Sequence, residues 1–276
     1  MPLHVAKADG TLEAFDPLKL RVSLHKAGAS EEATVTIVEE ITKELYEGIS
    51  TEEIYRRAFA HLREHRHEAA AHYSLKRALL EFGPSGFPFE AYLAELFRTE
   101  GYTAQIDQIV AGACVEHEVD VVMKKGNTTT YVEAKFHNTA AFKTDLKTTL
   151  YVKARVDDLR AAHPKEDMRG LIVTNTKLTS KAIQYASCEG LELLAWEYPH
   201  KNNLHDRIEA ARLYPVTALT TLSTHEKTLL LAEKIVLCKA LANDTNALER
   251  VGVRGKQVDA VLHEAALLCA PGKDIL

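Results

Sequence analysis

The fold of this chain is decided by residues 117–135, which read His-Glu-Val-Asp-Val-Val-Met-Lys-Lys-Gly-Asn-Thr-Thr-Thr-Tyr-Val-Glu-Ala-Lys. The apolar and β-branched runs at 119–123 and 128–136 are typical of two strands. The polar residues 124–127, which include a glycine, are typical of a turn between them. The stretch therefore predicts a hairpin.

Charged side chains gather at one end of this predicted hairpin. Residues two apart in a strand point to the same face, so Glu133 and Lys135 project together, and Asp120 faces them from the neighbouring strand. Phosphodiester hydrolysis uses a metal ion to polarise the phosphate and to lower the pKa of a water molecule. Because Mg²⁺ and Mn²⁺ prefer oxygen ligands, we expect Asp120, Glu133 and the backbone carbonyl of Ala134 to bind the metal. Lys135 is expected to orient or help deprotonate the attacking water, or to stabilise the transition state.

An alternation of helices and strands surrounds the hairpin. A linker rich in glycine and proline, 83–88, comes before it. The expected order of elements is α-β-β-β-α-β-α-β, which predicts an α/β domain with a mixed sheet. The expected helices are 89–100, 145–162 and 180–187, and the further expected strands are 102–115 (broken near Gly112), 170–175 and 191–196.

The hairpin resembles that of the PD-(D/E)xK nuclease superfamily, whose signature is an acid on one strand and E-x-K on the next. Residues 84–199 are most similar to the Mrr-type restriction endonucleases. This resemblance implies that Glu90, on the preceding helix, joins the catalytic residues, with Glu95 as the other candidate. Val119 stands where the superfamily often has proline. The resemblance is carried by Phe89, Glu90, Gly101, Tyr102, Glu118, Val119, Asp120, Val132, Glu133, Ala134 and Lys135.

Four polar residues beside the motif have two interpretations each. His117 either donates to a phosphate or is structural, and structure is the more frequent role of such a histidine. Glu118 shares a strand face with Asp120, so it is either a third metal ligand or a solvated residue. His137 and Asn138 either contact a phosphate backbone or only form the loop after the strand.

The charge of the chain is uneven. Its net charge of −5 argues against a protein that coats nucleic acid nonspecifically. A local basic strip nevertheless runs from Lys124 to Arg155 and overlaps the expected active site. Within it, Lys143, Lys147 and Lys153 are candidates for contacts with a DNA backbone, the alternative being a solvated helix face.

The N-terminal part of the chain predicts a short hairpin, 3–15, that turns at Asp9-Gly10 and is followed by helices. The expected helices are 17–27, 31–47, 51–65 and 69–81, with Ser30 and Ser50 as N-terminal caps.

This part resembles an ATP-cone domain over residues 1–82, on the segments 5–10, 13–20 and 49–54. The resemblance implies regulatory binding of ATP or dATP, in which the lysines grip phosphate. Ala8 stands where the family usually has arginine, and a degenerate cone that serves only oligomerisation is the alternative. No P-loop pattern is present, so we expect sensing rather than hydrolysis of the nucleotide. The residues expected to bind the nucleotide are Val5, Lys7, Glu13, Lys19 and Thr51.

Residues 201–276 have an apolar periodicity that predicts a wholly helical region. The step Val251-Gly252-Val253 resembles a helix-hairpin-helix turn, in which backbone amides meet a DNA phosphate. A structural or dimerising helical cap is the alternative.

Together these observations predict three domains, 1–83, 84–200 and 201–276. The expected function is a Mg²⁺-dependent DNA endonuclease of the restriction or defence type, regulated by ATP or dATP and assembled as a homo-oligomer through the cone or the C-terminal helices. The alternative is a non-catalytic, nucleotide-sensing regulator that binds nucleic acid. Because no apolar run reaches bilayer length and the first ten residues carry no secretory signal, we expect a cytoplasmic protein without a membrane span. Four separated cysteines predict reduced thiols rather than a disulfide framework or a zinc site.

Overall fold

The computed structural model of this chain describes residues 3–7, 10–27, 29–65, 67–244 and 246–270. Residue contacts divide the chain into two compact units. The first comprises Met1–Ala78, Tyr214–Leu230 and Cys238–Leu276, and the second comprises Leu79–Leu213 and Leu231–Leu237. Position 8 and the first residue of the predicted Asp9-Gly10 turn lie outside the described residues.

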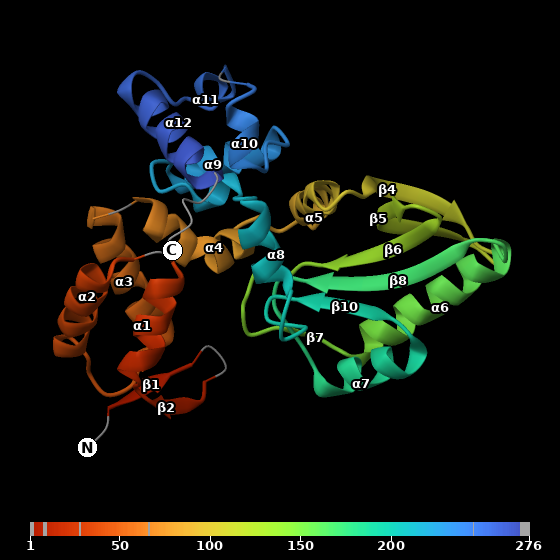
Figure 1. The fold of residues 1–276 in the computed structure, drawn as a ribbon, viewed down its shortest axis with the longest axis horizontal. Helices are drawn as coiled ribbons and strands as arrows, with labels where there is room; N and C mark the ends of the chain where they lie inside the picture. Colours follow the sequence, from red (N-terminus) through yellow and green to blue (C-terminus); the bar gives the residue numbers. More distant parts are fainter. Residues whose placement is uncertain (1–2, 8–9, 28, 66, 245, 271–276) are drawn as a thin grey trace. The chain divides into compact units, whose positions relative to one another are not determined.

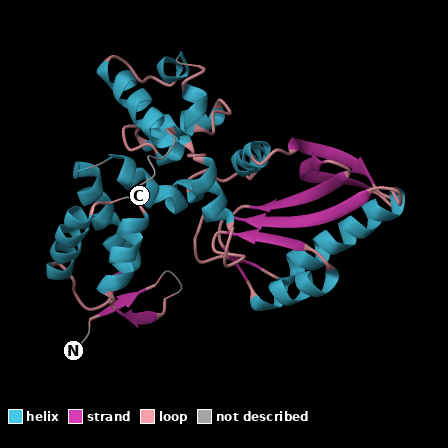
Figure 2. Cartoon of the chain, in the orientation of Figure 1, coloured by secondary structure: helices cyan, strands magenta, loops and turns pink. Residues whose placement is uncertain are grey.

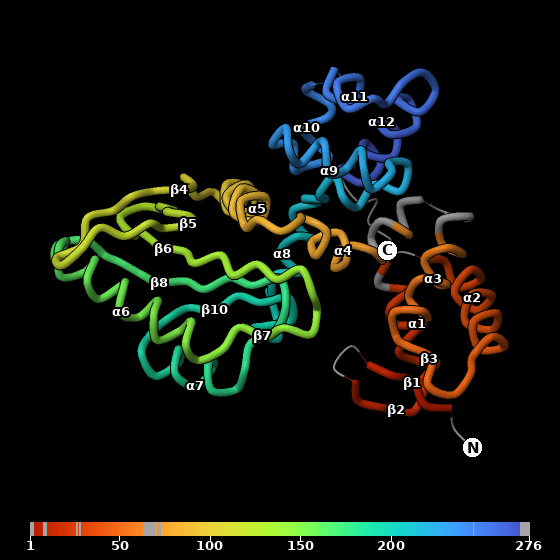
Figure 3. The backbone as a smooth tube through the Cα atoms, turned by 180° about the vertical axis from the view of Figure 1, so that it is seen from behind, coloured from red at the N-terminus to blue at the C-terminus, as the bar shows by residue number. Residues whose placement is uncertain are grey.

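A three-stranded sheet opens the first unit (Figure 3). Strands β1 (His4–Ala6) and β2 (Leu12–Ala14) are antiparallel, as the predicted hairpin requires. Strand β3 (Ile49–Ser50) pairs in parallel with β1 and was not predicted. Two residues are too few to show a sequence period, so only the pairing of Ile49 with Val5 and of Ser50 with Ala6 reveals this strand.

Four helices complete the N-terminal part of the first unit. Asp16 caps the first of them by accepting from the N–H of Leu18 at 2.9 Å, and Ser30 caps the second by accepting from the N–H of Ala33 at 3.2 Å. The second helix ends four residues before the predicted position, which leaves room for the turn into β3. The helices are α1 (Pro17–Lys26), α2 (Glu31–Lys43), α3 (Thr51–His65) and α4 (His67–Leu80).

The second unit is built on a five-stranded mixed sheet of order β10-β8-β6-β5-β4 (Figure 2). Strands β4, β5 and β6 are antiparallel neighbours, and β8 and β10 continue the sheet in parallel with β6. The predicted mixed α/β sheet is therefore confirmed. The strands are β4 (Thr103–Ala111), β5 (Glu116–Lys125), β6 (Thr128–Lys135), β8 (Asp167–Thr174) and β10 (Glu192–Ala195), with a separate pair β7 (Lys143–Thr144) and β9 (Lys177–Leu178).

Two glycines shape the β4–β5–β6 meander. Gly126, at φ 58°, forms the predicted turn between β5 and β6, where its left-handed backbone favours glycine. Gly112 lies in the loop between β4 and β5, where the predicted strand 102–115 ends at Ala111. A Cβ at Gly112 would lie 2.0 Å from an oxygen of Asp158, so the loop approaches helix α6 (Leu146–Ala162) that closely only because it has no side chain there.

Helices cover the sheet from two sides (Figure 1). Helix α5 (Phe87–Thr99) packs against β4, β5 and β6, and it begins inside the predicted linker because Pro88 suits a first helical turn. Helices α6 (Leu146–Ala162) and α7 (Ser180–Glu189) pack against each other, α6 also against β8 and α7 against β10. Helix α8 (Leu204–Ala211) packs on α5.

The C-terminal region is mainly helical, as predicted, and its helices range from 4 to 14 residues. Turns separate them, and Gly252, at φ 92°, lies at the break in the apolar period between α11 and α12. Buried Glu264 links two of the segments by accepting four hydrogen bonds of 2.7–3.0 Å from the backbone and hydroxyl groups of Thr220 and Thr221. The elements are a 3₁₀ turn (Val216–Ala218), α9 (Thr224–Ala232), α10 (Cys238–Leu241), α11 (Asn246–Arg250) and α12 (Lys256–Cys269).

Within the described ranges, no helix combines the length and the apolar character that a membrane span requires.

Candidate active site and nucleotide pocket

Asp120 and Glu133 lie at the end of the paired register of β5 and β6. The last paired residues are Val121 and Val132, so Asp120 and Glu133 are the next residues along each strand. Asp120 Oδ2 accepts a 2.6 Å hydrogen bond from the backbone N–H of Ala134. This bond fixes the Asp120 carboxylate beside the Glu-Ala-Lys motif.

Glu133 is held by a cation from α6. Arg155 Nη1 donates to Glu133 Oε2 at 2.7 Å, and the two side chains are only 9% and 12% exposed. Arg155 Nη2 donates to the Tyr151 hydroxyl at 2.5 Å, and the guanidinium carbon lies 4.6 Å from the centroid of the Tyr151 ring. Sequence reasoning placed Arg155 only in the basic strip, because no local motif shows which face of a helix meets the active site.

Glu90, on α5, lies in the electrostatic field of the same carboxylates. Burial raises the pKa of Glu90 to about 7, and repulsion from Asp120, Asp107, Glu118 and Glu133 adds to the effect. A carboxyl group with this pKa exchanges protons near neutral pH, as a general acid or base must.

The pKa of Asp120 is also raised. Burial raises the pKa of Asp120 to about 6, and repulsion from Glu133 contributes. The N–H of Ala134 and the positive charges of Arg155 and Lys135 act in the opposite direction without cancelling the effect. The cluster therefore has an excess of negative charge that an added cation would relieve.

Asp107, on β4, is a member of this cluster that sequence reasoning missed. The register of β4 with β5 places it level with Asp120, and its φ of 56° is one that L residues rarely adopt. A strand-like sequence does not show which residue of the next strand lies opposite, so no signal in the sequence identified Asp107. Glu95, the second candidate on α5, is paired with Arg98 instead.

The structure favours a structural role for His117. Its Nε2 lies 2.8 Å from Asp158 Oδ2, and Asp158 also accepts from the N–H of Cys114 at 2.9 Å. These contacts tie the β4–β5 loop to α6. Glu118 is exposed and acts on Glu90 through its charge.

His137 is fixed in the loop that follows Lys135. Its N–H donates to Asn175 Oδ1 at 2.9 Å, and its ring stacks on Phe142 at a centroid distance of 5.8 Å. Burial and the neighbouring Lys135 charge lower its pKa, so the ring is neutral at physiological pH.

The lysines of the basic strip differ in their surroundings. Lys143 and Lys147 are exposed, at β7 and in the first turn of α6. Lys153 is only 18% exposed and forms ion pairs with Asp157 and Glu189, so it is the least available of the three for DNA.

The donor atoms suit a hard divalent cation. Among the described residues, no group of three or more His, Cys, Asp or Glu side chains is arranged to hold a metal ion. Mg²⁺ commonly takes only one or two carboxylates together with water and substrate oxygens, and Asp120 and Glu133 supply two. The carbonyl of Ala134 accepts a 3.2 Å hydrogen bond from the N–H of Phe136, and a carbonyl oxygen has two lone pairs. The excess of negative charge at the cluster is the observation that supports this fit.

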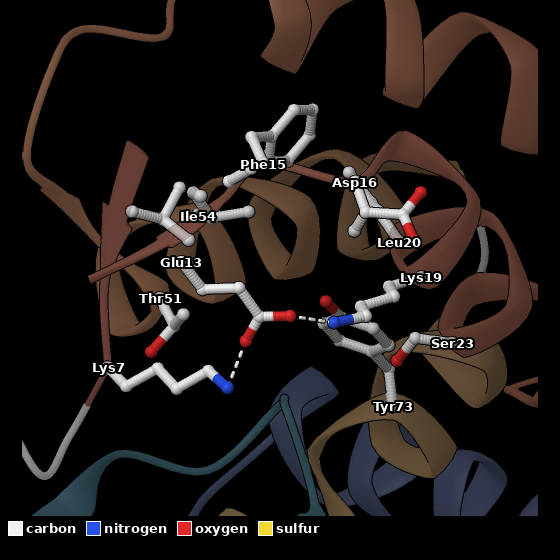
Figure 4. Close-up of a pocket in the computed structure, with 12 residues that line it drawn as sticks. Lys7, Glu13, Phe15, Asp16, Lys19, Leu20, Ser23, Thr51, Ile54 and Tyr73 are labelled. Atoms are coloured by element: carbon white, nitrogen blue, oxygen red, sulfur yellow. Dashed lines mark hydrogen bonds and ion pairs between the residues drawn. The ribbon is translucent and has the colours of Figure 1, made fainter. Parts of the chain in front are cut away.

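The first unit contains a cavity of about 350 Å³ between β1, β2 and the helices α1, α3 and α4 (Figure 4). The five residues expected to bind a nucleotide, Val5, Lys7, Glu13, Lys19 and Thr51, all line this cavity. Sequence reasoning did not include Asp16, Leu20, Ser23, Ile54 and Tyr73, which reach the cavity from the helices and their caps.

Glu13 lies between the two lysines of this cavity. Its carboxylate pairs with Lys7 through one oxygen and with Lys19 through the other (Figure 4). The hydrogen bond from Lys19, followed by that from Lys7, lowers the pKa of Glu13 to about 2. A phosphate that enters the cavity therefore meets two cations that a carboxylate already bridges.

Comparison with protein families matches three stretches of the chain. Residues 3–80 match the ATP cone domain, residues 84–197 match the restriction endonuclease family, and residues 214–269 match the AF1548-like C-terminal family. The resemblance of the first two stretches, predicted from the sequence, is thereby confirmed. The chain carries an ATP cone at its N-terminus, a restriction endonuclease domain at its centre and helices at its C-terminus.

Comparison with individual proteins finds similarity over part of this chain. An uncharacterised protein of Archaeoglobus fulgidus is 32% identical over 174 residues, which span 63% of this chain and 97% of the relative. The crystal structure of AF1548, a protein of unknown function, matches with a TM-score of 0.56 and 30% identity, over 67% of this chain and 98% of that one. A repair endonuclease from Pyrococcus abyssi has a TM-score of 0.32 and 25% identity, over 40% of this chain and 46% of that one. The chain therefore belongs to the AF1548-like family, as a protein that carries an ATP cone domain and a restriction endonuclease domain.

Proposed function

We propose that this protein is a metal-dependent endonuclease that hydrolyses phosphodiester bonds in DNA and is regulated by ATP or dATP at its cone. The observation that carries the proposal is the grouping of Asp120, Glu133 and Glu90, with Lys135 on the same strand as Glu133. Two carboxylates, an ammonium and a carboxyl group with a pKa near neutrality form the set of groups that this reaction uses.

Each residue has a defined part in the proposed reaction. Asp120 and Glu133 would hold Mg²⁺ or Mn²⁺, which supplies charge for the phosphate and lowers the pKa of water. The backbone of Ala134 keeps the Asp120 carboxylate in place. Lys135 stabilises negative charge on the phosphate or orients the water. Glu90 accepts or returns a proton at its carboxylate, because its pKa lies at about 7.

DNA would approach along the exposed lysines of the second unit. Lys143 and Lys147 supply positive charge without ordered partners of opposite sign in the described part of that unit. His137 is neutral and fixed by Asn175, so it would contact a phosphate by hydrogen bonding rather than by charge.

The cavity in the first unit supports the regulatory part of the proposal. Its volume suits a small ligand, and its lysines suit a polyphosphate. Apolar Val5 and Phe15 and the carboxylate of Glu13 would face the nucleoside. Binding would change the oligomeric state of the protein, and identical masses by size-exclusion light scattering with and without ATP or dATP would contradict this step.

The decisive experiment measures cleavage of plasmid DNA by the wild-type protein and by Asp120→Ala and Lys135→Ala. Each protein is assayed with Mg²⁺ or Mn²⁺, with and without ATP and dATP. We expect metal-dependent nicking that both substitutions abolish and that a nucleotide alters. Lys124→Ala is the matched control, because Lys124 is an exposed lysine on β5 at the opposite end of the paired register.

Two results would contradict the proposal. Equal cleavage by wild type and both variants would show that another group, or a contaminant, cuts the DNA. If wild type and variants are inert under every condition but bind DNA or nucleotide, the protein is a nucleotide-sensing regulator instead.

A further inference from the structure

Arg155 is a charged residue in a place where packing alone would favour an apolar one. It lies on α6 between the buried residues Val152 and Val156 and is only 8% exposed. Burial of a guanidinium costs free energy unless its donors are paired. Its Nη atoms are paired with Glu133 and Tyr151, whereas its Nε is buried without a hydrogen-bond partner. The incomplete pairing argues against a purely stabilising role.

The contacts of Arg155 restrict Glu133 in a specific manner. Nη1 donates to Oε2 of Glu133, and no residue within the described ranges forms a hydrogen bond with Oε1. Tyr151 holds the guanidinium from the other side, by its hydroxyl and by its ring. The chain Tyr151–Arg155–Glu133 therefore fixes the orientation of the carboxylate and leaves one oxygen for another partner.

Arg155 also sets the charge of the cluster. Glu90 and the four carboxylates around it bring five formal negative charges when all are ionised, and Lys135 and Arg155 bring two positive charges. Loss of Arg155 would make the cluster more negative by one charge. A divalent cation would then be attracted more strongly, but to a Glu133 that is free to rotate.

We propose that Arg155 is a positioning residue that holds Glu133 by one carboxylate oxygen, so that the other oxygen is presented to the metal. Its positive charge weakens metal binding, while its hydrogen bond fixes the orientation of the Glu133 carboxylate. This proposal rests on the proposed nuclease function. It predicts that metal affinity and catalytic rate change in opposite directions when an uncharged residue replaces Arg155. A merely structural arginine would lower both or neither.

The test measures binding of Mn²⁺ to the full-length protein without DNA, by electron paramagnetic resonance, for wild type and Arg155→Gln. We expect Arg155→Gln to bind Mn²⁺ at least about threefold more tightly, because one repelling charge is lost. We expect its cleavage rate at saturating Mn²⁺ to fall at least about tenfold, as is usual when a group that orients a metal ligand is removed.

Two further variants separate charge from orientation. Arg155→Lys keeps the charge, so its Mn²⁺ affinity should stay within about twofold of wild type while its rate falls. Tyr151→Phe removes only the hydroxyl of a residue that is 56% exposed, so it should fold normally, bind Mn²⁺ as wild type does and cut more slowly.

Several outcomes would overturn the inference. The inference is wrong if Arg155→Gln folds but binds Mn²⁺ no more tightly than wild type. The fluorescence of Trp196, which lies in the same unit, reports whether the variant folds. If Arg155→Gln does not fold, then unchanged rates in both Arg155→Lys and Tyr151→Phe would overturn it. A wild type that binds Mn²⁺ but cuts no DNA would refute the proposed function alone, because the affinity comparison still stands.

Discussion

Replacement of Glu90 by glutamine should stabilise the protein at alkaline pH and not at acidic pH. Glutamine has nearly the same shape as glutamate but carries no charge. Burial, and then repulsion from the neighbouring carboxylates, disfavour the ionised form of Glu90, so its charge destabilises the folded wild-type protein. The variant should lose catalytic function and gain stability together, as residues placed for chemistry often do.

The size of the gain follows from the pKa of Glu90, which rises from 4.5 to about 7. One pKa unit corresponds to about 1.4 kcal/mol, so the upper limit of the destabilisation is about 3 kcal/mol. Because solvent reaches part of the side chain and screens the charge, we expect about 1–2 kcal/mol.

The sign of the pH dependence is fixed by the direction of the shift. A carboxyl group with a raised folded-state pKa keeps its proton in the folded protein after the unfolded chain has lost it. Its folded state is therefore favoured below pH 4.5, and this advantage is lost as the pH rises from 4.5 to about 7. The gain of Glu90→Gln over wild type should grow across that window and level off above pH 7.

Urea denaturation at pH 5 and pH 8, followed by the fluorescence of Trp196, measures this effect in the relevant unit. Trp196 is the single tryptophan, is buried and belongs to the unit that contains Glu90. A chelator in the buffer keeps divalent metals away from the cluster. The matched control is Glu95→Gln on the same helix, where a glutamate pairs with Arg98 and no gain is expected.

The reasoning would be refuted by a Glu90→Gln variant that is less stable than wild type at pH 8. It would also be refuted by a gain of equal size at pH 5 and pH 8, because such a gain would not come from the charge. An equal gain in Glu95→Gln would indicate a general property of α5.

Three further predictions concern other parts of the chain. Glu264→Gln should lower the free energy of unfolding by about 2–3 kcal/mol, measured by circular dichroism, because an NH₂ group replaces one buried acceptor; an unchanged value would mean that these hydrogen bonds contribute little. Gly170→Ala should cost about 1–3 kcal/mol in the Trp196 fluorescence assay, since its Cβ would lie 2.7 Å from two apolar side chains; a neutral effect would show that these side chains move aside. Lys19→Ala should weaken ATP binding at least about tenfold by calorimetry, and unaltered affinity would place the phosphates elsewhere.

The sequence by itself determined the hairpin and the chemistry at its end. The period of two and the glycine turn at 124–127 are local features, so they predict β5, β6 and the joint projection of Glu133 and Lys135 without knowledge of the rest of the fold. Caps such as Ser30 likewise depend on neighbours along the chain. Short sequence motifs also indicated the two family resemblances.

The tertiary structure alone decided which distant groups complete the site. The packing of α6 brings Arg155 to the site, and the register of β4 brings Asp107 there. Neither contact can be predicted from the local sequence. The same holds for Lys153, which a glutamate on α7 partly neutralises, and for the two-residue strand at Ile49. The raised pKa of Glu90 is likewise decided by the tertiary structure. Its causes are burial and the repulsion of carboxylates that are far from Glu90 in the sequence, and both arise only when the chain folds.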